Sequence, residues 1–208
     1  SVIVKDFSKE KFKMNLKSNK VNVIKILPGG VVTAKDTAEI ELDANGEFVR
    51  NPKVDLVKVA VVERHQGTGN VACGFLKGYG IKEGAVALSV AHDSHNIIVV
   101  GVNDEEMEFA VNSLIEQEGG IVLVKEGKVI ESMPMPIAGL MSDQSGEWVD
   151  QKLTDIHEKA YEELGICGDV EPVMTLCFMS LAVVPEIKLT DMGLFDVTTF
   201  SFIPVEVE

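Results

Sequence analysis

Short apolar runs alternate with polar turns along most of this 208-residue chain. The runs at 56–62, 71–76 and 85–101 are rich in β-branched and small residues, and such residues favour pleated, packed surfaces. A polar turn at 92–96 interrupts the third run. We therefore predict two strands on either side of that turn, in addition to the strands at 56–62 and 71–76.

Turn signals flank this central region. Asn45-Gly46 and Glu126-Gly127 each separate two short β-branched runs, and Pro28 with the two glycines that follow it forms a further turn. These patterns are typical of hairpins, and the turns at 28–30 and 45–46 make residues 1–50 a short β-rich segment. Because an isolated two-stranded unit is marginal in water, we expect this segment to pack on other structure.

Two stretches have the periodicity of amphipathic helices. One spans 104–115, with Asn103 as a potential N-cap and Gly119 beyond its end. The other spans 146–164, whereas the apolar run 174–184 is compatible with a buried helix or a strand. Strands and helices in this order predict an α+β fold, with a mixed β-sheet flanked by helices.

The net charge of the chain bears on whether nucleic acid is a partner. The chain has 19 Lys and Arg against 33 Asp and Glu, a formal net charge of −14. An acidic surface repels phosphates, so we expect no nucleic-acid partner. Residues 5–20 hold six lysines and two acidic residues, a net charge of +4. We interpret this segment as a solvated face or a linker docked on an acidic neighbour, and a nucleic-acid arm is the alternative.

The sequence also bears on localisation. The polar start lacks the features of a secretory signal, and no apolar run reaches the ~18 residues that a membrane span requires. The cysteines Cys73, Cys167 and Cys177 are odd in number and have apolar neighbours, which favours buried thiols in a reducing compartment. We therefore expect a cytoplasmic protein with no membrane partner.

Candidate chemistry concentrates in the polar segments 63–70 and 91–96, which follow predicted strands. The side chains that could shape a site are His65, Asn70, His92, Asp93, His95 and Asn96. Loops carry function on a rigid scaffold, so we expect these residues to border a cleft. His65, His92 and His95 could converge on one metal ion, but histidines in turns also serve as hydrogen-bonding corner residues.

Three further features have both a functional and a simpler interpretation. Glu63 and Asp93 could act as acid and base, although the chain has many other carboxylates. Gly67 and Gly69 could form a nest of N–H groups for an anion, but the segment is no Walker loop or Rossmann fingerprint, and a tight turn is simpler. Cys73 has no local base that would activate it as a nucleophile.

Several longer strings resemble a known family. They are ERHQGTGNVACGFLKGYG (63–80), SVAHDSHNIIVVGVNDEEMEFAVN (89–112), GGIVLVKEGKV (119–129), PIAGLMSD (136–143) and IKLTDMGLFDV (187–197). In this order they closely resemble the C-terminal region of bacterial adenine deaminases. The lead-in is similar to the segment that leaves the catalytic barrel in that family, so the resemblance covers essentially the whole chain.

The resemblance implies a metal-dependent hydrolase that converts adenine and water to hypoxanthine and ammonia in purine salvage. In that family an amidohydrolase-type barrel with a His-x-His pair holds a divalent metal: manganese, iron or zinc. This sequence contains no His-x-His pair. We therefore expect no catalytic residue and no cofactor in these 208 residues, which would not deaminate adenine alone.

The resemblance also implies an organisation and partners. Residues 1–50 would belong to a small β-domain and the linker from the barrel, and 51–208 would form the C-terminal α/β domain. The partners would be adenine, the barrel of the same polypeptide and further copies in a homo-oligomer. We expect loops 63–70 and 91–96 to face the barrel mouth.

Two alternatives remain from the sequence. In the first, the chain is a structural and oligomerisation domain whose apolar segments 134–141 and 174–184 bury against the barrel or a sister subunit. In the second, it is a stand-alone module that binds a small molecule or a metal.

Overall fold

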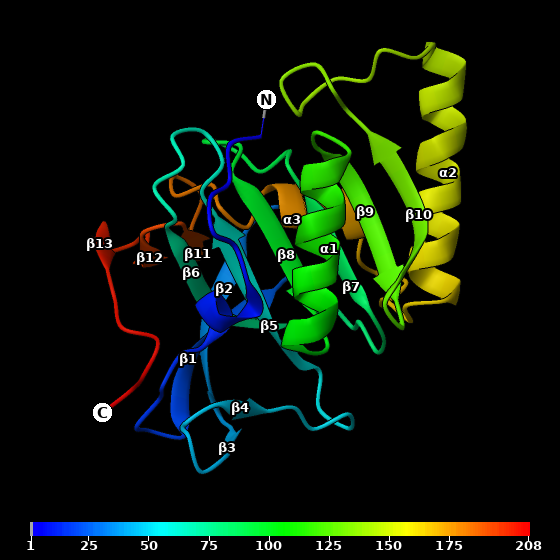
Figure 1. Ribbon diagram of the computed structural model, residues 1–208. Helices are drawn as coiled ribbons and strands as arrows, with labels where there is room; N and C mark the ends of the chain where they lie inside the picture. Colours follow the sequence, from blue (N-terminus) through cyan, green and yellow to red (C-terminus); the bar gives the residue numbers. More distant parts are fainter. Residues whose placement is uncertain (1) are drawn as a thin grey trace.

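The computed structural model describes residues 2–208 and is built on one large sheet (Figure 1). The strands of this sheet are β1 (Lys20–Ile26), β2 (Thr33–Glu39), β5 (Leu56–Val62), β6 (Val71–Lys77), β7 (Ala85–Leu88), β8 (Ile97–Gly101), β9 (Gly120–Lys125) and β10 (Lys128–Pro134). Their order is β10-β9-β7-β8-β5-β6-β1-β2. All neighbours are antiparallel except β1 and β6, which are parallel.

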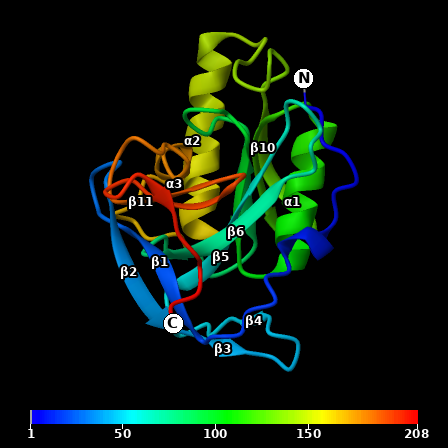
Figure 2. The ribbon, with the colours of Figure 1, turned by 90° about the vertical axis from the view of Figure 1, so that its left-hand side faces the viewer.

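Helices cover both faces of this sheet. They are the 3-10 helix η1 (Lys9–Phe12) and the α-helices α1 (Asp104–Glu116), α2 (Gly146–Glu162) and α3 (Pro172–Cys177). Helix α1 packs on one face, and α2 and α3 pack on the other (Figure 2). The predicted α+β fold, a mixed sheet flanked by helices, is confirmed.

Smaller β-structures complete the fold. They are the hairpin of β3 (Glu41–Leu42) and β4 (Phe48–Val49), and a three-stranded sheet of β11 (Ile187–Thr190), β12 (Gly193–Asp196) and β13 (Ser201–Phe202). The hairpins predicted around Asn45-Gly46 and Glu126-Gly127 are both present.

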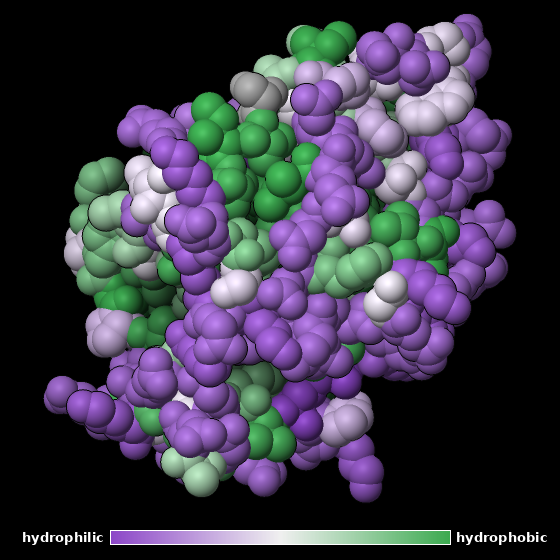
Figure 3. All heavy atoms as spheres, in the orientation of Figure 1, coloured by the Kyte–Doolittle hydropathy of each residue, from purple (hydrophilic) through white to green (hydrophobic). Residues whose placement is uncertain are grey.

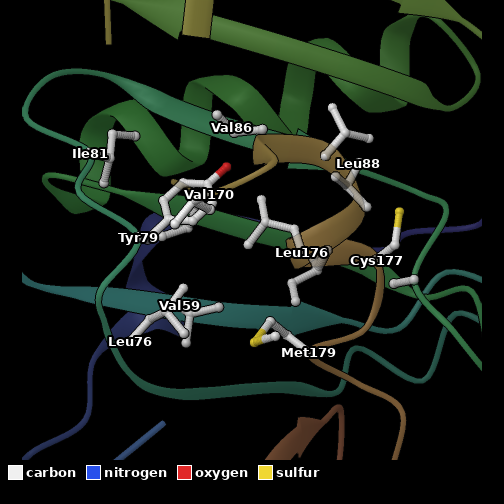
Figure 4. Close-up of a cluster of buried hydrophobic side chains, with 14 of the residues drawn as sticks. Val59, Leu76, Tyr79, Ile81, Val86, Leu88, Val170, Leu176, Cys177 and Met179 are labelled. Carbon is white, nitrogen blue, oxygen red and sulfur yellow. The ribbon is translucent and has the colours of Figure 1, made fainter. Parts of the chain in front are cut away.

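The central strand β5 is buried at every position. Alternate residues of a strand point to opposite faces, so Val59 and Val61 face α2 and α3 while Ala60 and Val62 face α1. Figure 4 shows part of the first core, where Val59 lies among side chains from β6, β7 and α3. Burial on both faces explains why this strand does not alternate between apolar and polar residues. Its one charged residue, Lys58, is paired with Asp104 at 2.8 Å.

A side chain caps α1 as the sequence predicts. The Asn103 side chain accepts a hydrogen bond from the Glu106 N–H group at 2.8 Å, at the start of α1. The apolar run 174–184, which the sequence left undecided, is helical only as far as Cys177 and continues in turns. The Glu171 carboxylate caps this short helix through the N–H groups of Val173 and Met174.

Both ends of the chain pack on the large sheet. Strand β1 pairs with β2 and β6, so the β-rich N-terminal segment packs on other structure, as expected. The C-terminal tail lies along β1, where the Asn22 N–H donates to the Val205 carbonyl at 2.7 Å and the Val207 N–H donates to the Lys20 carbonyl at 2.9 Å. The division into two domains near residue 50 stays a prediction.

The expectation of buried thiols is wrong for Cys167, which is exposed, whereas Cys177 is buried and Cys73 is half-buried. Cys167 lies in the loop after α2, directly after the buried Ile166. Its apolar neighbours in sequence are therefore in the core while its own side chain is not. None of the helices within residues 2–208 is long and apolar enough to cross a membrane.

Candidate functional site

The strand pairings bring three loops to one end of the sheet. Val62 at the end of β5 pairs with Ile97 at the start of β8. Pro134 at the end of β10 pairs with Gly120 at the start of β9. Loops 63–70, 89–96 and 135–145 therefore lie together, at the upper end of Figure 1. We call this region the loop end.

Arg64 joins these loops and is only 1% exposed. Its Nε donates to the His95 carbonyl at 2.6 Å, and its Nη2 donates to the Ala138 carbonyl at 3.0 Å. Its backbone N–H donates to the Asn96 side chain at 3.3 Å, and its carbonyl accepts from the Ile3 N–H at 2.8 Å. Burial lowers the pKa of Arg64. Arg64 thus connects loop 63–70 to two other loops through its guanidinium. Its backbone carbonyl connects the same loop to the N-terminal segment at Ile3.

Ser89 and Gly139 complete this junction. The Ser89 hydroxyl donates to the Gly139 carbonyl at 2.6 Å and accepts from the Gly120 N–H at 2.7 Å. Gly139 has φ +72° and lies against the guanidinium, where a Cβ would come within 2.9 Å of the Arg64 Nη1 atom. Only glycine fits this backbone and this space without displacement.

Glu63 determines the shape of loop 63–70. Its Oε1 accepts from the N–H groups of His65 and Gln66 at 2.5 and 2.8 Å, and its Oε2 accepts from the Thr68 N–H and hydroxyl at 2.9 and 3.0 Å. Burial alone would raise the pKa of Glu63, but the backbone N–H groups of Thr68, Gln66 and His65 outweigh it and lower that pKa to about 2. A carboxylate held in this way is poorly matched to proton transfer near neutral pH.

The loop end gathers three imidazoles from two loops. The His92 ring stacks on Phe178, with centroids 4.9 Å apart, and meets the His95 ring edge-on at 5.1 Å. His65 comes from the other loop, and its Nε2 lies 2.7 Å from the Ser94 carbonyl oxygen. The His92 N–H also donates to the Cys177 carbonyl at 2.7 Å, which ties this loop to α3. Together the rings form a stacking and hydrogen-bonding surface.

His95 is held as a neutral imidazole at neutral pH. Burial lowers its pKa, and the nearby His92 and Arg64 lower it further. Its Nδ1 is buried and has no hydrogen-bond partner within residues 2–208. A neutral ring with one unsatisfied nitrogen is suited to hydrogen bonding with a polar group that reaches it.

The other candidate residues lie around these rings. Asn96 is buried and bonds the Arg64 backbone, which makes it part of the framework. Asp93 is exposed at the tip of its loop. Asn70 lies at the far side of loop 63–70, where its Nδ2 is 3.5 Å from the Asp191 carboxylate and 3.5 Å from the Met192 sulfur.

The histidines are not arranged as metal ligands. Within residues 2–208, no group of three or more His, Cys, Asp and Glu side chains could hold a metal ion. The ring of His92 faces Phe178 and His95, and His65 is engaged with a backbone carbonyl. The geometry therefore gives no support to metal binding by His65, His92 and His95.

Sequence reasoning missed Arg64, Ser89 and Phe178. Arg64 has only one local signal: it follows a fully buried strand by two residues, where a charged side chain is close to the core. The partners of its guanidinium lie 31 and 74 residues away in the sequence. No local pattern identifies such contacts.

The sequence of this chain matches a described protein family. A family model described as the adenine deaminase C-terminal domain matches residues 30–201. The chain is 68% identical over 203 residues to adenine deaminase 2 of Desulfotalea psychrophila, with 98% of this chain and 35% of that protein covered.

Two further relatives cover the chain to a similar extent. It is 48% identical over 208 residues to adenine deaminase of Ligilactobacillus salivarius, with 100% of this chain and 36% of that protein covered. It is 45% identical over 202 residues to adenine deaminase 2 of Carboxydothermus hydrogenoformans, with 97% and 35% covered. The chain thus spans about a third of the length of the curated relatives that it matches.

Proposed function

Because the chain belongs to the adenine deaminase C-terminal domain family, we propose that it works as one domain of a longer adenine deaminase. The whole protein would hydrolyse adenine to hypoxanthine and ammonia in purine salvage. A divalent metal such as manganese, iron or zinc, held outside these residues, would activate the water that attacks the purine. The 208 residues themselves would then lack turnover.

The role of this domain is to shape the adenine site with its loop end. The supporting observation is that His65, His92 and His95 gather at the end of the sheet to which the first residues of the chain are also bound, through Ile3 and Arg64. The family is described as a C-terminal domain, so in such a protein the other part would precede these residues in sequence, on the side of Ile3 and the loop end.

The chemistry of the loop end suits a purine. Adenine is planar and aromatic, with ring nitrogens that accept hydrogen bonds and an amino group that donates them. The His92 ring, stacked on Phe178, offers an aromatic face, and the neighbouring His95 ring meets it edge-on. These groups would orient adenine and exclude water from the adenine site.

Kinetics of the full-length enzyme test this role. We expect His92→Ala and His65→Ala each to lower kcat/KM by about tenfold or more, a loss of about 1.4 kcal/mol of transition-state stabilisation. Lys128→Ala is the matched control, because Lys128 is exposed at the opposite end of the sheet. Unchanged kcat and KM in both histidine variants would overturn the role, and ammonia release by the 208-residue chain alone would contradict the division of labour.

A structural and oligomerisation domain is the second candidate. Large apolar side chains are exposed in both segments that suggest it: Ile137 is 46% and Met141 58% exposed, and Met174 is 53% and Val183 70% exposed. Single apolar residues at a surface are ordinary, but pairs in two segments favour an interface. In this case Met141→Ser and Val183→Ser would change the oligomeric state by light scattering and leave the kinetics of the assembled enzyme unchanged.

A further inference from the structure

The small sheet of β11, β12 and β13 has an exposed aromatic surface. Phe195 packs edge-on against Phe200 and Phe202, with ring centroids 5.3 and 5.2 Å apart. Phe200 is 73% exposed, Phe202 55% and the nearby Met192 67%. We call these four residues the aromatic flank, and Figure 3 shows apolar side chains gathered where β12 and β13 lie.

The turn that presents Phe200 is rigidly built. The Asp196 Oδ1 accepts from the Thr198 hydroxyl at 2.6 Å and from the N–H groups of Thr198 and Thr199 at 2.9 and 3.2 Å. Its Oδ2 forms an ion pair with Lys35 at 2.9 Å. Phe200 itself has φ +53°, a left-handed conformation that a bulky residue rarely adopts. The hydrogen bonds fix the turn, and the strained backbone of Phe200 holds its ring in solvent. A surface fixed in this way loses little conformational entropy when it binds a partner.

The aromatic flank is continuous with the loop end. Met192 lies 3.5 Å from the Asn70 side chain, and Asn70 belongs to loop 63–70. The N-terminal segment contacts the same loop, since the Lys11 ammonium donates to the Gly69 carbonyl at 2.9 Å. The N-terminal segment, through Lys11, and the aromatic flank, through Met192, therefore both contact loop 63–70.

We propose that the aromatic flank binds, through an apolar surface, the part of the full-length polypeptide that precedes this chain. The inference rests on the proposed function only in that the chain is one domain of a longer protein. About two-thirds of the length of adenine deaminase 2 of Desulfotalea psychrophila lies outside the region that matches this chain. That part would be joined covalently to the N-terminal segment, which contacts loop 63–70 through Lys11, so its effective concentration at this surface would be on the order of millimolar.

Charge favours this occupant over a second copy of the chain. Two copies each with a formal net charge of −14 repel one another. A surface of three phenylalanines and one methionine has no charge of its own to offset that repulsion. A part of the same polypeptide is already held near this surface by its covalent link, so its binding does not require two separate acidic chains to associate.

Site-specific thiol labelling of the full-length protein tests the inference. Phe200→Cys, Met192→Cys and the control Val129→Cys are labelled with a maleimide under native conditions and quantified by mass spectrometry of the separate peptides. Val129 is 45% exposed on β10, which is the edge strand of the large sheet opposite to β2. If the aromatic flank is covered, cysteine at 200 or 192 is labelled at least about tenfold more slowly than cysteine at 129. Protection must also be independent of protein concentration.

Each other outcome is informative. Labelling at position 200 as fast as at 129 overturns the inference, and position 192 provides the same readout if Phe200→Cys fails to fold. Protection that grows with protein concentration identifies a second copy as the occupant and overturns it as well. The kinetics of the His92 and His65 variants are a separate measurement, so the proposed role of the loop end can fail while the aromatic flank is still protected.

Discussion

Replacing Glu63 with glutamine removes one charge from loop 63–70 and keeps the shape of the side chain. The two carboxylate oxygens accept four hydrogen bonds, two each. The side-chain oxygen of glutamine can accept one of these two pairs of hydrogen bonds. The amide nitrogen would face the Thr68 N–H, which loses its acceptor, while the Thr68 hydroxyl can rotate and accept.

The pKa of Glu63 gives the magnitude. A pKa of about 2 in the folded protein, against an ordinary value of 4.5, corresponds to about 3 kcal/mol of stabilisation at neutral pH. Because the folded-state pKa is lowered, this stabilisation is fully present above pH 4.5 and is lost as the pH falls towards 2. We therefore expect Glu63→Gln to lower the free energy of unfolding by about 3 kcal/mol at pH 7.

Urea denaturation at a series of pH values measures this quantity. The control is Glu162→Gln, because Glu162 is exposed near the end of α2, and we expect it to change the free energy of unfolding by less than about 0.5 kcal/mol. The wild-type chain should lose stability between pH 4.5 and 2 more steeply than the glutamine variant. A loss below about 1 kcal/mol at neutral pH, or parallel pH profiles for the two proteins, would refute the reasoning.

Three further predictions concern other residues. Gly139→Ala should destabilise the chain by about 2–3 kcal/mol in urea denaturation and Gly127→Ala by about 1 kcal/mol, since both have left-handed backbones but only Gly139 lies against a buried guanidinium; equal losses would contradict this. Under native conditions Cys167 should react readily with a thiol reagent, whereas Cys177, buried and with its pKa raised to about 12, should react only on unfolding; peptide mapping that finds equal rates counts against the fold. His95 should titrate by NMR below its ordinary value of 6.5, so that its neutral form stabilises the fold and this contribution is lost as the pH falls through the folded-state pKa; a midpoint above 6.5 is incompatible with its burial.

Local patterns predicted the elements of the fold well. The strand at 56–62 has the predicted bounds, and the helix at 104–116 starts at the predicted cap. Both depend on contacts between near neighbours, which sequence periodicity encodes. The parallel pairing of β1 with β6 depends on residues about 50 apart, and no local pattern identified it.

The candidate site was predicted only in part. The polar residues after strands 56–62 and 85–88 drew attention to two loops, and the strand order brings those loops together, whereas their role in a site stays a prediction. Arg64 was missed because a polar loop suggests a solvated charge, whereas the carbonyls that accept from its guanidinium come from distant loops. The third loop, 135–145, is anchored to Ser89 by a tertiary contact 50 residues apart in sequence, which no local pattern identifies.

The position of β1 has a practical consequence for cutting the polypeptide into expressible pieces. The family match begins at residue 30, yet β1 ends at Ile26 and lies inside the sheet, clasped by the tail beyond residue 201. A recombinant piece trimmed to the matched range would lack the interior strand β1. Strand β2 would then have no neighbour in the sheet, and β6 would expose unpaired backbone N–H and C=O groups. Such a piece should aggregate during purification, and a useful truncation must keep residues on both sides of the recognised family segment.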